Sequence, residues 1–153
     1  MSNQRKGQAL RDTNLGFRVE RATATLPAST TGELFTISGG RVMITSIVGE
    51  VTTLIQTQLN NTKLIANPTT GTSVDMCAVL DITADEVGCL YGITGTPSDA
   101  LIGTNAGLTP AMAKALILNT GTIDLSCSAT NTGSVKWSLT YIPIDDGAAV
   151  VAA

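Results

Sequence analysis

Histidine is absent from this chain of 153 residues. It is the commonest general base near neutral pH and the commonest metal ligand in proteins, so its absence excludes Ser-His and Cys-His catalytic arrangements. The chain also contains no Walker-type phosphate loop, no dinucleotide-binding glycine motif, no HExxH motif and no EF-hand spacing. With the common catalytic templates missing, we expect a protein that is not an enzyme and that uses no cofactor or metal.

Charged residues make up only 14% of the chain and aromatic residues only 3%. Soluble domains typically contain about 25% charged residues. So few charges indicate a surface partly covered by other subunits, because subunit contacts favour apolar and neutral polar groups. A water-exposed surface of Thr, Ser and Asn is the alternative. Sugar-binding sites usually contain exposed aromatic side chains on which the sugar ring packs. Four of the five aromatic residues in this chain occupy strand positions expected to face a core, so few are left for such a site. The five are Phe17, Phe35, Tyr91, Trp137 and Tyr141.

The three cysteines have no metal-ligand spacing. Cys89 and Cys127 fall in the apolar phase of alternating segments, so we expect them to be buried as small hydrophobic side chains. Cys77 is out of phase with the apolar residues around it, and we expect it to face elsewhere. A disulfide between Cys77 and Cys89 remains open as an alternative.

Long apolar runs are also missing. No stretch approaches the roughly 20 residues needed to cross a bilayer, and residues 1–16 hold no apolar core of signal-peptide length. The sequence therefore predicts synthesis in a cytoplasm and a protein that is not integral to a membrane.

What the chain does contain is alternation of apolar residues with Thr, Ser or Asn. Val135, Trp137, Leu139 and Tyr141 alternate with polar residues, which places four large side chains on one face of a strand. Similar signals predict strands over 17–21, 34–37, 41–56, 64–65, 74–83, 87–94, 115–119, 123–129 and 134–144.

Two of these strands should form a hairpin, 74–83 with 87–94, and Gly49 should mark a bulge or a corner between sheets. Thr109 and Pro110 resemble a helix N-cap and first turn, which predicts at most two turns of helix there. About eight short strands with regularly spaced turns favour an all-β, two-sheet sandwich of the jelly-roll kind. An immunoglobulin-like sandwich is the second choice.

The predicted organisation is an N-terminal arm (1–16), one β domain (17–147) and a tail of small residues (148–153). The first 21 residues hold five basic and two acidic residues, a net charge of +3, so the rest of the chain, which is −3 overall, carries −6. We expect a flexible basic arm that binds an acidic neighbouring subunit. It lacks the aromatic interleaving of a nucleic-acid-binding segment, and a solvated terminus is the alternative. The predicted contacts are Arg5, Lys6, Arg11, Arg18 and Arg21.

A second predicted contact surface is the long irregular stretch 95–109. Long loops in compact domains often carry binding residues, and this one serves either as a recognition loop or as a strap on a neighbouring subunit. Its predicted contacts are Thr96, Pro97, Asp99 and Asn105. A third group, Asp81, Asp85 and Glu86, is either a calcium site or a solvated turn.

Taken together, the chain resembles the small virion proteins of tailed bacteriophages, in particular capsid decoration (cement) proteins. The resemblance covers the whole chain and rests on the Met1-Ser2-Asn3 start with its basic arm, on Thr/Gly-rich stretches such as 120–123 and 130–133, and on the small-residue tail. It implies a non-enzymatic structural protein, a homotrimer bound to the major capsid protein on the outer surface of the virion, without nucleic acid or membrane. A tail, fibre or baseplate component and a lectin-like ligand-binding module are the alternatives.

Overall fold

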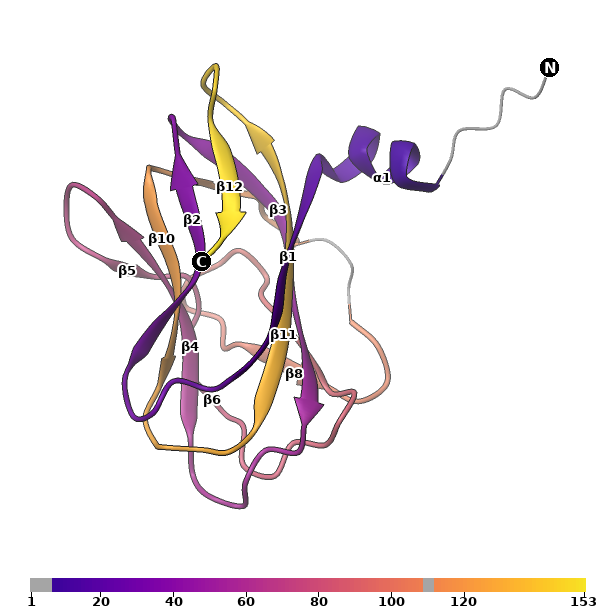
Figure 1. Ribbon diagram of the computed structural model, residues 1–153, viewed down its shortest axis with the longest axis vertical. Coiled ribbons are helices and arrows are strands. Elements are labelled where there is room, and N and C mark those ends of the chain that lie inside the picture. Colours follow the sequence, from indigo (N-terminus) through magenta and orange to yellow (C-terminus); the bar gives the residue numbers. More distant parts are fainter. Residues whose placement is uncertain (1–6, 109–111) are drawn as a thin grey trace.

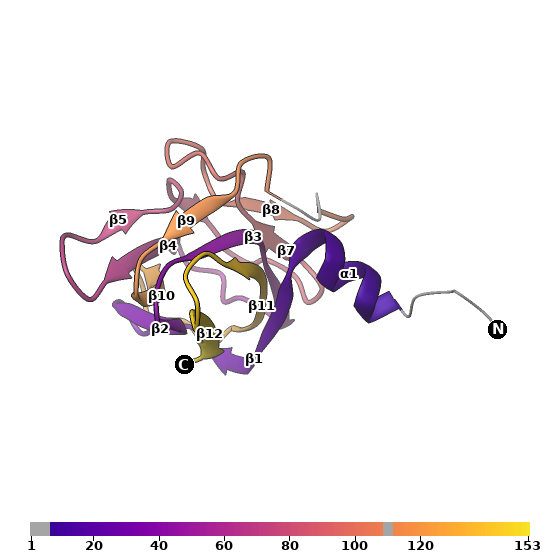
Figure 2. The ribbon, with the colours of Figure 1, turned by 90° about the horizontal axis from the view of Figure 1, so that it is seen from above.

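The structure is a computed structural model that describes residues 7–108 and 112–153. Two antiparallel sheets of six strands each face one another (Figures 1 and 2), which confirms the all-β sandwich. The first sheet holds β1 (Phe17–Thr25), β11 (Ser134–Pro143), β3 (Val42–Thr53), β7 (Leu90–Gly92) and β8 (Ile102–Thr104) in that order, with β9 (Leu116–Leu118) also paired to β3. The second sheet holds β12 (Ala149–Ala152), β2 (Thr31–Ser38), β10 (Gly121–Cys127), β4 (Asn61–Pro68) and β5 (Val74–Asp75), with β6 (Leu80–Asp81) also paired to β4.

The path of the chain between the sheets is that of a jelly roll. It crosses from β1 to β2, back to β3, over to β4 and its partners, back to β7, over to β10 and back to β11. The resulting orders, β1-β11-β3-β7 and β2-β10-β4-β5, are those of an eight-stranded double Greek key. Strands β6, β8, β9 and β12 are additions to this frame, which raise the number of strands above the eight predicted.

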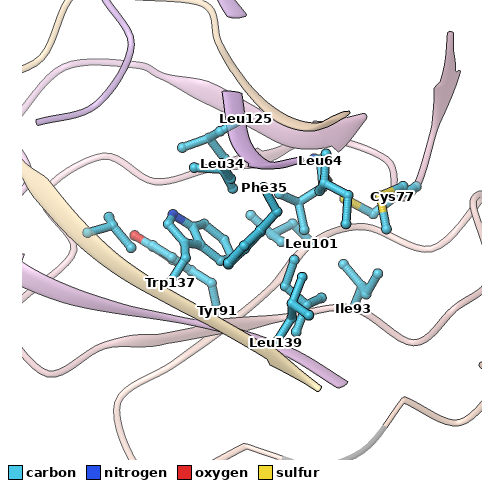
Figure 3. Close-up of a cluster of buried hydrophobic side chains, with 14 of the residues drawn as sticks. Leu34, Phe35, Leu64, Cys77, Tyr91, Ile93, Leu101, Leu125, Trp137 and Leu139 are labelled. Atoms are coloured by element: carbon cyan, nitrogen blue, oxygen red, sulfur yellow. Dashed lines mark hydrogen bonds between the residues drawn. The ribbon is translucent and has the colours of Figure 1, made fainter. Parts of the chain in front are cut away.

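The alternation in β11 produces the inner face as predicted. Val135, Trp137 and Leu139 are buried, whereas Lys136 between them is exposed. They meet the inner face of the second sheet, where Phe35 is fully buried (Figure 3). Burying a side chain of this size contributes about 1.5–3 kcal/mol to folding. The core therefore stabilises the sandwich without a disulfide.

Gly49 serves a different purpose from the one predicted. It lies within the continuous strand β3, directly opposite Trp137 in the register, and a Cβ at Gly49 would stand 2.9 Å from the indole ring carbons. The bulge prediction at this glycine is wrong, because the register shifts fall on either side of it, between Ser134 and Val135 and between Thr140 and Tyr141. The missing side chain makes room for the ring.

The predicted hairpin of 74–83 with 87–94 is wrong. The first segment splits into β5 and β6, which both pair with β4, whereas β7 in the second pairs with β3 and β8. Met76 and Cys77 are both buried between these short strands, and the Cys77 sulfur accepts a hydrogen bond from the Leu64 N–H at 3.4 Å. Successive side chains of a regular strand point to opposite faces, and the burial of both Met76 and Cys77 coincides with the break between β5 and β6. Cys77 is therefore not turned to another surface, and all three cysteines are free and buried.

The chain ends also differ from the prediction. Residues Ala149–Ala152 of the expected tail form β12, which pairs with β2 at the edge of the second sheet. Within the expected arm, Gly7–Leu15 form helix α1. The helix ends at Leu15, and Gly16 after it has a φ of +89°, the left-handed conformation that favours glycine. The helix start predicted at Thr109 and Pro110 lies outside the described residues, and residues 112–115 just after it are not helical.

Candidate functional site

Helix α1 extends away from the sandwich rather than packing on it (Figures 1 and 2). None of its residues is buried, and the side chain of Leu10 is 49% exposed. The helix is tied to the body at its end, where the Thr45 hydroxyl donates a hydrogen bond of 2.6 Å to the Leu15 carbonyl. Isolated helices shorter than about 12 residues are marginal in water, and most helical stability in proteins comes from a packed apolar face. The body of the protein therefore gives this helix little support from packing, and the side chain of Leu10 is left largely exposed.

The basic residues predicted as one contact surface are divided among three places. Arg5 and Lys6 lie outside the described residues, and Arg11 lies on α1. Arg18 on β1 forms an exposed ion pair with Glu20 on the same strand. Arg21, three residues along β1, lines a pocket between the two sheets. Strand alternation separates the last two, because residues an odd number of positions apart face opposite sides.

The pocket beside Arg21 is called the inter-sheet pocket below. Its volume is about 250 Å³, and it lies where the edge of β1 faces β2. Arg21, Thr30 and Glu33 supply polar groups to its lining. The apolar part of the lining comes from Leu26, Pro27, Leu34, Leu125, Val135 and Trp137. Sequence reasoning placed Trp137 in the core but did not find the pocket, because the pocket depends on how far the two sheet edges stand apart.

The predicted loop residues are also separated. Thr96, Pro97 and Asp99 belong to one turn, which is held by a 2.7 Å hydrogen bond from the Thr94 hydroxyl to the Asp99 carboxylate. Asn105 lies at a different place, beside the acidic residues Asp81 and Asp85.

Pro97 borders an apolar groove of about 290 Å³, which is lined by parts of β4, β5 and β9. Val74 and Ile117 in its lining are each 60% exposed. Sequence reasoning missed this groove. A weak signal was the run Leu116-Ile117-Leu118, where three apolar residues in succession leave one on the outer face of a strand.

The acidic residues near Asn105 are occupied by hydrogen bonds. Asp81 accepts hydrogen bonds from the backbone N–H of Asn60 and from the N–H and hydroxyl of Thr83. The bond from the Thr83 hydroxyl is the main reason that the pKa of Asp81 is lowered. Asp85 accepts a 2.6 Å hydrogen bond from the Tyr91 hydroxyl, and burial followed by this contact raises the pKa of Tyr91. Among residues 7–108 and 112–153, no group of three or more acidic or cysteine side chains is arranged to hold a metal ion.

The thiols are unsuited to nucleophilic chemistry. Burial raises the pKa of Cys77, Cys89 and Cys127 above that of a free cysteine. A thiolate, rather than a thiol, is the nucleophile in cysteine catalysis and the ligand in metal sites. The three side chains therefore act as small apolar groups in the core.

Within the described part of the chain, no helix is long and apolar enough to span a membrane. Comparison of the sequence with models of known families and with curated proteins, and of the fold with solved structures, found no match. The function has to be inferred from the fold, helix α1, the apolar groove and the inter-sheet pocket.

Proposed function

We propose that this chain is a non-enzymatic structural protein of a virion, a capsid decoration protein that binds the major capsid protein on the outer surface of a phage head and assembles as a homotrimer. The observation that carries this proposal is helix α1, which leaves the body without burying any residue and exposes Leu10 beside Arg11. A helix of this kind gains its stability when its apolar face is covered by another subunit.

Charge supports the same role. Residues 1–16 hold three basic residues and one acidic residue, a net charge of +2, so the rest of the chain carries −5, and the arm of one copy is attracted to the body of another or to an acidic coat subunit. Three arms on one trimer would bind with high effective concentration, so each could contribute as little as about 2–4 kcal/mol and still hold the protein on a shell. Jelly rolls are frequent in viral capsid proteins. This support is an analogy of fold alone, and one fold occurs in proteins with many different functions.

The test compares the full chain with a chain that begins at Leu15, which keeps the Leu15 carbonyl bonded to Thr45. Each would be mixed with heads of the encoding phage prepared without this protein and then sedimented. We expect the full chain to sediment with heads and the shortened chain to remain in solution, while light scattering reports the oligomeric mass of each. Equal sedimentation of both chains would contradict the role of α1.

Tails purified from the same phage serve as the control particle. Binding to tails but not to heads would reject a decoration role and support the tail, fibre or baseplate alternative. Binding to neither particle would reject a virion role for the chain.

A further inference from the structure

Two residues that line the inter-sheet pocket each have a buried hydrogen-bond donor with no acceptor among the described residues. One is the indole N–H of Trp137, whose side chain is only 1% exposed, and the other is the Nε–H of Arg21. Both residues line the same pocket. Figure 3 shows the indole nitrogen on the side of the ring toward Leu34 and Leu125, which line the pocket as well.

A buried donor without an acceptor is costly, about 1–3 kcal/mol, and more for a charged group. Each such group in a native structure calls for an explanation. Among the described residues seven buried side-chain polar atoms have no hydrogen-bond partner, and two of them belong to residues that line this one pocket. The remaining wall is apolar, with Leu26, Pro27 and Val135 in its lining. A ligand that satisfies this pocket therefore has an anionic acceptor at one end and an apolar stem at the other.

We propose that the inter-sheet pocket binds a carboxylate carried on an apolar stem, with Arg21 and Trp137 donating to the carboxylate oxygens. An arginine matches a carboxylate in charge and in the geometry of its donors. The pocket is accessible from the edge of the sandwich. Strand β12 covers β2 only from Ser38 to Phe35, so residues 31–33 of β2 are not paired with β12. A volume of about 250 Å³ is close to the lower limit of about 300 Å³ for small-molecule sites and suits a short stem.

An inward-pointing charge on an edge strand can also serve to prevent edge-to-edge aggregation. That role would explain Arg21 on β1, which is the edge of the first sheet. It does not explain why the indole N–H of Trp137, in the neighbouring strand β11, is left without an acceptor in the lining of the same pocket. Ligand binding accounts for both donors.

Glu33 is the other charged residue of the lining, and it lies on β2 across from Arg21. A carboxylate at this position repels an anionic ligand, while Arg21 attracts it. The two residues should therefore have opposite effects on affinity when they are neutralised one at a time.

The experiment uses the fluorescence of Trp137, which is the only tryptophan in the chain and reports directly on the pocket. Hexanoate would be titrated into the full chain up to about 10 mM, a range that detects dissociation constants near 1 mM. Its neutral analogue hexanamide would be titrated in parallel. We expect a saturable change with hexanoate and none with hexanamide. No saturable change with any carboxylate, or equal changes with acid and amide, would overturn the proposal.

A second arm distinguishes two sources of the same chemistry. A short peptide ending in a free aliphatic C-terminus would be compared with hexanoate and with the same peptide amidated at its end. Tighter binding of the free peptide would identify a polypeptide terminus as the ligand, and tighter binding of hexanoate would identify a small acid. Either result supports the carboxylate site.

Three variants complete the test. Arg21→Met should weaken hexanoate binding about tenfold or more, as expected for a lost charge-assisted hydrogen bond, and Glu33→Gln should strengthen it severalfold. Arg18→Met, on the outer side of the same strand, should leave it unchanged and is the matched control. Binding that is unaffected by Arg21→Met in a protein with normal circular dichroism would overturn the proposal. If Arg21→Met does not fold, an unchanged affinity in Glu33→Gln would overturn it instead.

Discussion

The sandwich and helix α1 are held by different physics. In the sandwich, Phe35, Ile44 and Trp137 are at most 1% exposed, and their burial stabilises the fold whatever surrounds the molecule. In α1, no residue is buried and the contact with the body is made at its last turn. The comparison teaches that the core can be altered only at a cost to folding, whereas changes in the arm should leave folding intact and, under the proposed function, weaken assembly.

The largest expected effect comes from filling the space under the Trp137 ring. Gly49→Ala would place a Cβ 2.9 Å from ring carbons of Trp137, a side chain that is only 1% exposed, so the strand or the ring has to shift. Overpacking of this kind costs about 1–3 kcal/mol. We expect a clear drop in the midpoint of urea unfolding.

Gly7→Ala is the matched control in the arm, because a Cβ at Gly7 meets nothing within 4 Å. Its unfolding midpoint should stay within the error of the wild type. If Gly49→Ala and Gly7→Ala unfold at the same urea concentration, the distinction between body and arm does not hold at these positions.

The next effect concerns a buried polar residue that joins two loops of the sandwich. The side-chain oxygen of Asn60, which is fully buried, accepts hydrogen bonds from the N–H groups of Ser128 and Ala129 at 3.0 and 3.3 Å. Asn60→Ala leaves both donors without this acceptor, which should cost about 2 kcal/mol. The neighbouring substitution Asn61→Ala, at an exposed side chain, should cost less than about 0.5 kcal/mol. Thermal unfolding of the two variants side by side would test the difference, and equal melting temperatures would refute it.

A smaller effect depends on pH. Arg41 donates two side-chain hydrogen bonds to the Asp145 carboxylate, which lowers the pKa of Asp145 to about 2. A carboxyl group whose folded pKa is depressed contributes stability above its unfolded pKa and loses it as the pH falls through the folded value. We therefore expect stability to decline between about pH 4 and pH 2 in the wild type.

Asp145→Asn should remove this part of the decline, whereas Asp146→Asn, which keeps the pair with Arg41, should retain it. Urea unfolding at several pH values measures both slopes. Identical pH dependence in Asp145→Asn and the wild type would show that the ion pair does not contribute.

The smallest effect on stability is expected in the arm itself. Leu10→Ala shortens a side chain that is 49% exposed on a helix with no buried residue, so the melting temperature should not change. Binding to heads, measured by sedimentation, should fall markedly if Leu10 packs on another subunit. A lower melting temperature with unchanged binding would reverse the assignment of this residue.

Sequence reasoning was most successful where neighbouring residues carry the signal. The alternation of Val135, Trp137 and Leu139 predicts a strand and its buried face without knowledge of any partner. The eight core strands and the jelly-roll class follow from many such segments. The basic character of the arm was also visible, but its division among α1, the outer side of β1 and the inter-sheet pocket was not.

By itself, then, the sequence determined the fold class, most strand positions and the uneven distribution of charge, because all three depend on composition and on a period of two along the chain. Only the tertiary structure decided that residues 74–94 pair with three different strands, that Ala149–Ala152 join β2, and that Gly49 makes room for Trp137. It also brought Arg21, Glu33 and Trp137 into one pocket. These outcomes depend on which residues distant in the chain meet across the two sheets, and no local pattern contains that information.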